Sequence, residues 1–238
     1  MIRALASGLL AAVFAATAGA QASPSPKPAP RAKPTVPASA GPAAPAVDYA
    51  QQYSAVCTAC HGLQGRSDMP LVPSLAGQHS SYVITQLFLF REGRRQDHPL
   101  SAAMVAVAKG LSDNDLRGYS ESIAKLPKWT AAEVAGIAAA PAADLARWAR
   151  GQRLADGHRC ASCHGTDYAG GGQVPRLAQQ REDYLQIALK GFRSGARLGY
   201  TPAMNEALVG IDPASLDDLA HYLAHFVAHH AGQAPAAR

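Results

Sequence analysis

The chain has 238 residues, of which 48% are hydrophobic, 16% charged and 6% aromatic. This length allows one or two domains, and the apolar fraction suffices for a core, which excludes a wholly disordered chain. No long, strongly apolar run follows the N-terminal region, which excludes a multi-span membrane protein. The net charge is +5, but four basic residues and no acid precede residue 48. The rest is nearly neutral, which argues against nucleic-acid binding.

The first 22 residues have the pattern of a secretory signal peptide. Arg3 is followed by a soft apolar stretch over residues 4–16 and by small residues at positions 18–22. This order of basic, apolar and small residues is typical of a cleavable export signal. An uncleaved anchor is the alternative, but a short alanine-rich stretch is a weak membrane span. We therefore expect an exported chain.

Residues 23–47 form a proline- and alanine-rich segment that contains eight of the seventeen prolines. Proline lacks the amide donor that helices need, so this segment cannot build a helix or a core. We expect a disordered linker, acting as a tether or simply as a variable tail.

From residue 48 onward the sequence nearly repeats itself with a period of about 100 residues. Residues 57–62 (CTACHG) match residues 160–165 (CASCHG), and the VPSLA segment at 72 matches VPRLA at 174. Further matching pairs are Tyr82 and Tyr184, Phe90 and Phe192, Gly93 and Gly195, and Met104 and Met204. We predict two similar domains, at residues 48–127 and 141–238, joined by a connector at 128–140.

Both domains are predicted to be helical. Apolar residues recur at helical spacing over residues 82–90 and 184–192. Ser112 and Asp113 are typical caps for a helix after them, and the pair Asp212-Pro213 is a typical opening for another. The buried faces of these two helices are expected to carry Leu116, Tyr119, Ile123, Leu216, Leu219 and Leu223. No alternating β pattern of useful length is present, so the fold class is all-α.

The sequence C-x-x-C-H, present twice, is the attachment signature of c-type haem. Positions i, i+3 and i+4 share one helix face, so Cys57 and Cys60 can both reach the haem edge while His61 turns toward the iron. The second copy consists of Cys160, Cys163 and His164. Two copies in a repeat, behind an export signal, predict two covalently bound haem c groups.

Other uses of these cysteines fit less well. A zinc ribbon places its two C-x-x-C pairs about 15–20 residues apart, whereas these are about a hundred apart. A thioredoxin-like pair is expected near a βαβ pattern, which the chain lacks. Disulfides can form in exported proteins, but they would leave both histidines without a role.

The sixth iron ligand decides whether the iron can bind a substrate. Met104 and Met204 occupy equivalent places, 43 and 40 residues after their histidines, and a methionine thioether opposite histidine raises the reduction potential. Met69 has no counterpart in the second repeat. The alternatives are that the paired methionines merely fill core space, or that His98 ligates the first iron. We predict His61 and Met104 for one iron, and His164 and Met204 for the other.

These features together resemble the cytochrome c4 family over residues 50–230. The resemblance rests on both haem motifs, on residues 75–78 (LAGQ) and 93–95 (GRR), and on Met104 followed by KGLS at 109. It implies two tandem class I cytochrome c domains, each wrapped around one covalent, His/Met-ligated haem and packed about a pseudo-two-fold axis. It also implies a periplasmic electron carrier of a respiratory chain, with partners such as a dehydrogenase or a terminal oxidase, and with peripheral membrane association as one option.

Two other functions compete with the carrier. A di-haem oxidoreductase, such as a thiosulfate dehydrogenase or a peroxidase, would need an open iron site or an additional cysteine ligand. All four cysteines are already used by the two motifs, and each repeat has its own methionine. A di-haem subunit of a larger dehydrogenase, comparable to that of flavocytochrome sulfide dehydrogenases, is also compatible with the linker. We expect a non-catalytic carrier, with no catalytic residues.

Several arginines end or follow the tyrosine-containing helices: Arg91, Arg94, Arg95, Arg193 and Arg197. Guanidinium groups match carboxylate geometry, so some of them could pair with haem propionates. A solvated helix end is the simpler interpretation, and we expect it for most of them.

Three histidines step by four residues near the end of the sequence: His221, His225 and His229, with His230 adjacent. Histidines at i and i+4 on one helix face can bind a divalent metal. The sequence identifies no carboxylate or cysteine ligand to accompany them. We therefore expect a wet surface stripe.

Overall fold

The computed structural model describes residues 47–130, 132–134 and 144–227, all of which belong to one compact unit spanning residues 46–238. The predicted signal peptide, nearly all of the proline-rich linker, most of the connector, and His229 lie outside the described residues. Within the described part, no helix is both long and apolar enough to cross a membrane.

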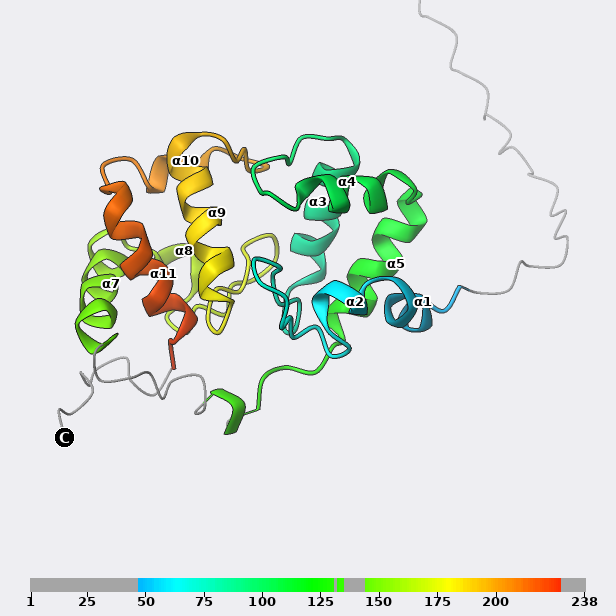
Figure 1. Ribbon diagram of the computed structural model, residues 1–238, viewed down its shortest axis with the longest axis horizontal. Coiled ribbons are helices and arrows are strands. Elements are labelled where there is room, and N and C mark those ends of the chain that lie inside the picture. Colours follow the sequence, from blue (N-terminus) through cyan, green and yellow to red (C-terminus); the bar gives the residue numbers. More distant parts are fainter. Residues whose placement is uncertain (1–46, 131, 135–143, 228–238) are drawn as a thin grey trace, which may run out of the picture. The chain divides into compact units, whose positions relative to one another are not determined.

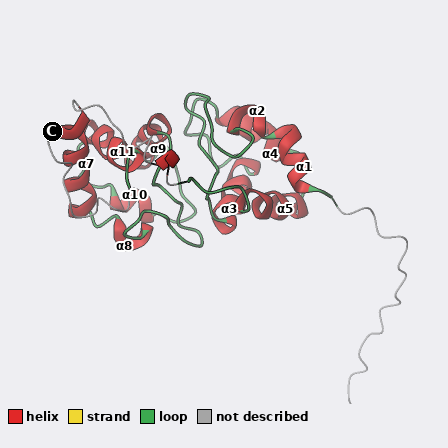
Figure 2. Cartoon of the chain, turned by 90° about the horizontal axis from the view of Figure 1, so that it is seen from below, coloured by secondary structure: helices red, strands yellow, loops and turns green. Residues whose placement is uncertain are grey.

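Two groups of helices follow one another along the chain (Figure 1). The first group is α1 (Tyr49–Val56), α2 (Thr58–His61), α3 (Ser80–Arg91), α4 (Ser101–Lys109) and α5 (Asp113–Ala124). The second is α7 (Leu145–Gly157), α8 (Ala161–His164), α9 (Glu182–Ser194), α10 (Ala203–Ala207), η2 (Pro213–Ser215) and α11 (Leu216–Ala224). Figure 2 shows helices and loops, and the β structure in the described residues is one isolated bridge between Gly171 and Val174. The all-α prediction is confirmed.

The predicted capping residues begin the helices that they were expected to begin. The Ser112 side chain accepts from the Asp115 amide and the Asp115 carboxylate accepts from the Ser112 amide, so α5 starts with a capping box. Asp212 accepts from the Ala214 amide and opens η2, which leads into α11. These side chains satisfy amides that a helix start leaves without partners. The predicted core positions of α5 and α11 are buried.

In each half, the first helix crosses the last one and an aromatic pair marks the crossing. The rings of Tyr49 and Tyr119 lie 5.2 Å apart between α1 and α5, and those of Trp148 and Tyr222 lie 5.0 Å apart between α7 and α11. A glycine lies at both crossings, Gly118 in the first half and Gly151 in the second. A Cβ at Gly118 would lie 2.0 Å from the Tyr49 ring.

The two halves contact each other through a pair of symmetric hydrogen-bonded clamps. Gln180 accepts from the Ser74 amide at 2.8 Å and donates to the Ser74 carbonyl at 2.9 Å. Gln78 accepts from the Arg176 amide at 3.1 Å and donates to the Arg176 carbonyl at 2.8 Å. The glutamines occupy matching repeat positions, as do Ser74 and Arg176. These exchanged contacts have the pseudo-two-fold relation that the resemblance implied.

Candidate haem sites

Each cysteine motif forms one short turn of helix directly after the first long helix of its half. In α2 the His61 amide donates to the Cys57 carbonyl at 2.9 Å, and in α8 the His164 amide donates to the Cys160 carbonyl at 3.0 Å. The predicted i, i+3, i+4 face is therefore present in both copies. The residue after His61 must be glycine, because its φ is +76° and a Cβ there would lie 2.1 Å from the Arg66 carbonyl oxygen.

Both motif histidines are buried and held by one ring nitrogen. The Nδ1 of His61 lies 2.9 Å from the Pro73 carbonyl oxygen, and that of His164 lies 3.0 Å from the Pro175 carbonyl oxygen. Burial lowers the pKa of both imidazoles, although the bond to the proline carbonyl opposes this. A neutral ring that donates from Nδ1 presents Nε2 as a metal ligand. The matched VP segments of the repeat thus supply the orienting carbonyls.

The four cysteines are not joined in disulfides. Cys57 and Cys160 pack against the hydrophobic core of their own half, whereas Cys60 and Cys163 are exposed. Burial raises the pKa of the Cys57 thiol to about 11, and also raises that of Cys160. A raised pKa disfavours the thiolate on which a redox-active dithiol depends.

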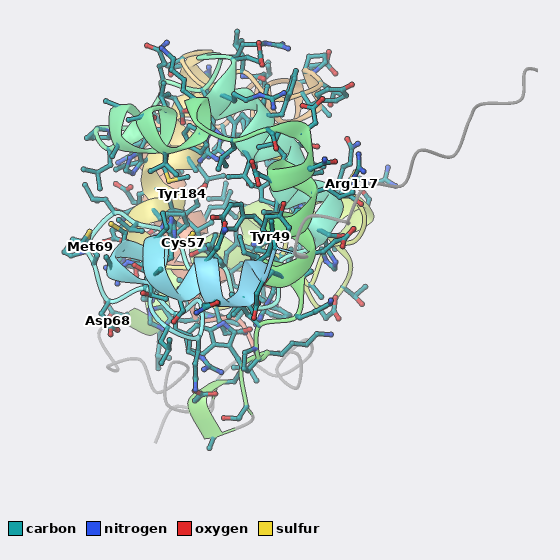
Figure 3. All side chains as sticks on the ribbon, turned by 90° about the vertical axis from the view of Figure 1, so that its right-hand side faces the viewer. Tyr49, Cys57, Asp68, Met69, Arg117 and Tyr184 are labelled. Carbon is teal, nitrogen blue, oxygen red and sulfur yellow. The ribbon has the colours of Figure 1, made fainter. Side chains whose placement is uncertain are left out.

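Each predicted methionine packs against the same core as the first cysteine of its half: Met104 with Cys57, and Met204 with Cys160. His98 lies elsewhere, with its ring 6.1 Å from that of Tyr184 in the second half. Met69 is 40% exposed and lies at the edge of the view in Figure 3. The structure thus brings Met104, and not Met69, to the first-half core.

The expectation of solvated helix ends is wrong for Arg95 and Arg197, which are 5% and 4% exposed. They occupy matching repeat positions and reach across the junction between the halves. Arg95 donates to the Tyr184 hydroxyl at 2.8 Å, and Arg197 donates to the Tyr82 hydroxyl at 3.5 Å. The expectation holds for Arg94, which is exposed. Tertiary packing of one half against the other buries the two arginines.

Arg95, Arg197 and Asp97 form a buried cluster at the junction between the halves, and this cluster carries an excess of positive charge. Asp97 lies within 3.8 Å of both buried guanidinium groups, so two cations share this one carboxylate. The Nε of Arg95 is buried without a hydrogen-bond partner. Burial raises the pKa of Tyr184, but Arg197 and Arg95 outweigh it and lower the pKa to about 8. A buried, under-compensated cation pair fits an anionic group such as a haem propionate.

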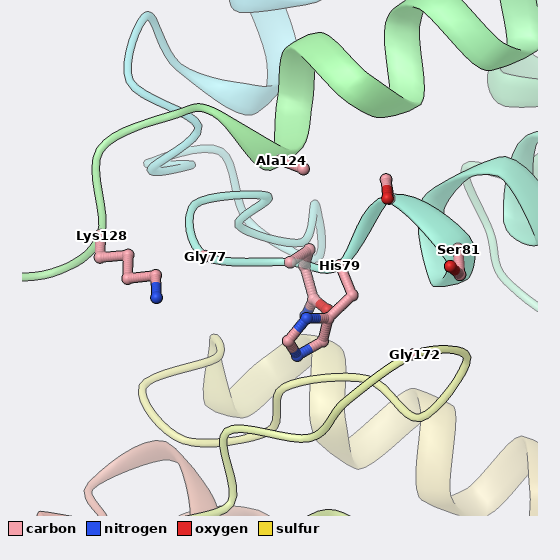
Figure 4. A pocket seen from close by; sticks show the side chains of 8 residues that line it. Gly77, His79, Ser81, Ala124, Lys128 and Gly172 are labelled. Carbon is pink, nitrogen blue, oxygen red and sulfur yellow. The ribbon is translucent and has the colours of Figure 1, made fainter.

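A polar pocket of about 310 Å³ also lies at this junction (Figure 4). His79 reaches from its rim toward the loop that carries Gly172, and its Nε2 lies 2.8 Å from the Ala169 carbonyl oxygen. The cysteine motifs and the methionines do not line this pocket. Its wall holds the halves together and is not a haem site.

The expectation of a solvent-exposed histidine stripe is wrong for His221, which is 2% exposed. Its Nδ1 lies 2.9 Å from a carboxylate oxygen of Glu182, which also contacts His225. No sequence pattern identifies this carboxylate, because Glu182 is 39 residues away from His221 and only the packing of α9 on α11 joins them.

The interface residues Gln78, Gln180 and Asp97 were also missed as functional positions. The two glutamines had a usable signal, since the LAGQ segment ends at Gln78 and Gln180 matches it in the repeat. Asp97 had no such signal in the repeat, because its counterpart in the second half is Gly199.

Comparisons with known proteins agree with this geometry. The cytochrome c family model matches twice, at residues 47–139 and 148–226. A cytochrome c4 of Thiocapsa roseopersicina is 35% identical over 60% of this chain and 71% of that protein. A cytochrome c4 structure from Acidithiobacillus ferrooxidans has a TM-score of 0.59 at 32% identity, covering 71% of this chain and 98% of the other. A thiosulfate dehydrogenase electron acceptor of Thiomonas intermedia is 33% identical over 61% of this chain and 66% of its own length.

The two matches to the family model fall on the two helical groups, and each contains one cysteine motif followed by its methionine. Cytochrome c domains of this kind bind haem c covalently, so the chain carries two haem groups and transfers electrons. It belongs to the cytochrome c family, among the di-haem cytochromes c4.

Proposed function

We propose that Cys57 and Cys60 hold the first haem through thioether bonds and that Cys160 and Cys163 hold the second. His61 and Met104 would ligate the first iron, and His164 and Met204 would ligate the second. These assignments divide the chain into domains at 48–127 and 141–238. The observation that carries the proposal is duplicated: a buried histidine fixed by a proline carbonyl, beside a core that contains the cysteine and methionine of its own half.

The bound haem supplies an iron that changes between the ferric and ferrous states. The protein would keep the histidine and methionine ligands of each iron in place, so that little rearrangement would accompany each change of charge. The carbonyls of Pro73 and Pro175 fix the histidine rings, and the first cysteine and the methionine of each half pack against its hydrophobic core. Because each iron would take one histidine and one methionine ligand from the chain itself, it would not be available to a substrate, and we infer a carrier rather than an enzyme.

The partners of this carrier are redox proteins of the periplasm. The basic, apolar and small residues in turn over residues 1–22, which are typical of an export signal, support this location. Two haems would let an electron enter at one domain and leave at the other. A relative named as an electron acceptor of thiosulfate dehydrogenase supports a dehydrogenase of this class as the donor. A terminal oxidase of the respiratory chain is the corresponding acceptor.

A potentiometric titration followed by absorption spectroscopy tests the proposal. We expect two covalent haems per chain, two one-electron steps, and the methionine-to-iron charge-transfer band in the oxidised protein. Carbon monoxide should not bind readily to the ferrous protein. Ready binding without any mutation would show an open iron site and favour a di-haem oxidoreductase.

The buried arginines are proposed to pair with haem propionates. Removing a cation beside a haem favours the ferric state, so Arg95→Gln and Arg197→Gln should each lower a reduction potential, by an amount on the order of 50 mV, close to a tenfold change in the one-electron equilibrium. Arg94→Gln is the matched control, since Arg94 is exposed. Unchanged potentials in both buried variants would remove the propionate assignment.

A further inference from the structure

The second domain contains a cluster of three metal-ligating side chains on helices α9 and α11, which pack against each other (Figure 1). Glu182 is the first residue of α9, His221 lies in the last turn of α11, and His225 caps the end of α11. The His225 amide still donates to the His221 carbonyl at 3.1 Å. The two imidazoles therefore remain on one face, with ring centroids 4.5 Å apart.

The ligand atoms are spaced as a metal ion requires. One Glu182 oxygen, Oε2, lies 2.9 Å from the Nδ1 of His221 and 3.5 Å from the Nε2 of His225, and one ligand atom from each residue falls within 4.8 Å of the others. Tetrahedral zinc with bonds of about 2.0–2.1 Å separates its ligand atoms by roughly 3.3 Å. The observed separations bracket that value, so small side-chain movements would complete the geometry.

The carboxylate is held in place by a second set of contacts. Its other oxygen, Oε1, accepts from Arg147 at 2.9 Å and from Gln186 at 3.3 Å. Burial raises the pKa of Glu182, but hydrogen bonds from His225, His221 and Arg147 outweigh it and lower the pKa to about 2. Outer contacts of this kind orient ligating carboxylates in metal sites. Oε2 is thereby presented as an anion to the histidine pair.

We propose that Glu182, His221 and His225 form a binding site for a divalent transition-metal ion of the zinc class. Two imidazoles and one carboxylate are a ligand set that zinc accepts. The side chains of Glu182 and His225 are 26% and 24% exposed, which leaves an approach for the ion and a position for water or a further ligand. The site is separate from both haem irons, whose ligands come from other residues.

Binding requires the proton between His221 and Glu182 to leave. The Nε2 of His221 is buried without a hydrogen-bond partner, so it gives the ring no outer support. A missing outer-shell partner weakens metal affinity by about 10- to 100-fold.

The repeat provides an internal control. Alignment of Asp218, Leu219 and Tyr222 with Asp115, Leu116 and Tyr119 places Gly118 opposite His221, Ser122 opposite His225, and Ser80 opposite Glu182. Glycine and serine do not make up a zinc site, so the first domain should not bind the ion. The expected stoichiometry is one ion per chain.

The test is isothermal titration calorimetry of the di-haem protein with zinc chloride, after adventitious metal has been removed. The number of zinc ions bound per chain is measured separately after dialysis. Zinc is the suitable probe because it undergoes no redox reaction with the haems. We expect one ion per chain, at least a tenfold loss of affinity in His225→Gln and in Glu182→Gln, and no change in His158→Gln, an exposed histidine on the same domain.

Haem absorption and circular dichroism would show that each variant is folded, and His225→Gln is the safest variant because its side chain is partly exposed. The proposal fails if the native protein binds no zinc, or if folded His225→Gln and Glu182→Gln bind it unchanged. It also fails if a His229→Gln/His230→Gln variant loses the site entirely, because the ion would then belong to the C-terminal histidines.

Discussion

The two domains share one sequence pattern but differ in how much polypeptide core stabilises it. In the described residues of the second domain, Trp148, Tyr168, Tyr222 and Phe226 form a chain of edge-to-face contacts with centroids 4.7 to 5.8 Å apart. The first domain has a smaller cluster around Tyr53 and Tyr119. We therefore expect the haem to contribute a larger share of the core in the first domain, because a small domain has little apolar surface of its own to bury.

Removing one haem at a time should give the largest difference between the two domains. We expect Cys57→Ala/Cys60→Ala to lose most of the helical structure of the first domain, and Cys160→Ala/Cys163→Ala to leave the second domain partly folded. Far-ultraviolet circular dichroism and limited proteolysis would measure this. Equal loss in both variants would show that the larger aromatic core does not compensate for the haem.

Replacing the methionines should give the next largest effect. Met104→Ala and Met204→Ala should each remove one thioether ligand and lower one potential by a substantial part of the roughly 0.8 V range that axial ligands cover. Each should also remove about half of the charge-transfer band. A spectrum unchanged by Met104→Ala would contradict the assignment of Met104 and favour His98 as the ligand of the first iron.

The helix crossings offer a sharper stability test. A Cβ at Gly151 would lie 2.1 Å from the Asp218 backbone oxygen, whereas a Cβ at Gly118 would meet the Tyr49 ring, which can move. Gly151→Ala should therefore cost about 3 kcal/mol of unfolding free energy, and Gly118→Ala about 1 kcal/mol. Denaturant unfolding of each variant would give both numbers, and a reversed order would contradict the rigid-crossing argument.

The glutamine clamps should show the smallest difference. Gln180→Ala leaves the buried amide and carbonyl of Ser74 without partners, and Gln78→Ala does the same to the less buried backbone of Arg176. We expect losses of about 2 kcal/mol and about 1 kcal/mol respectively. Denaturation measured by the haem band would test this, with Gln96→Ala as an exposed control. A larger loss of unfolding free energy in Gln78→Ala than in Gln180→Ala would contradict the expectation that the contact between Gln180 and Ser74 is the stronger one.

Local sequence signals were sufficient for much of the fold. The caps at Ser112 and Asp212, the apolar spacing of α3 and α9, and the one-turn geometry of both cysteine motifs follow from short-range rules, because each depends on residues within one or two helical turns. The repeat added the pairing of Met104 with Met204. The haem-ligand assignments built on these signals stay predictions until spectra test them.

The number of haem motifs, the helical class and the family could all be predicted from the amino-acid sequence, since all three are encoded in spacing and repetition. The surroundings of the charged side chains depend on the tertiary structure. Arg95 and Arg197 were expected in water and are buried, because the two halves pack against each other where these side chains lie. His221 meets Glu182 because α9 packs on α11. Burial and ion pairing depend on contacts between residues distant in the chain, and a spacing pattern within one helix carries no information about them.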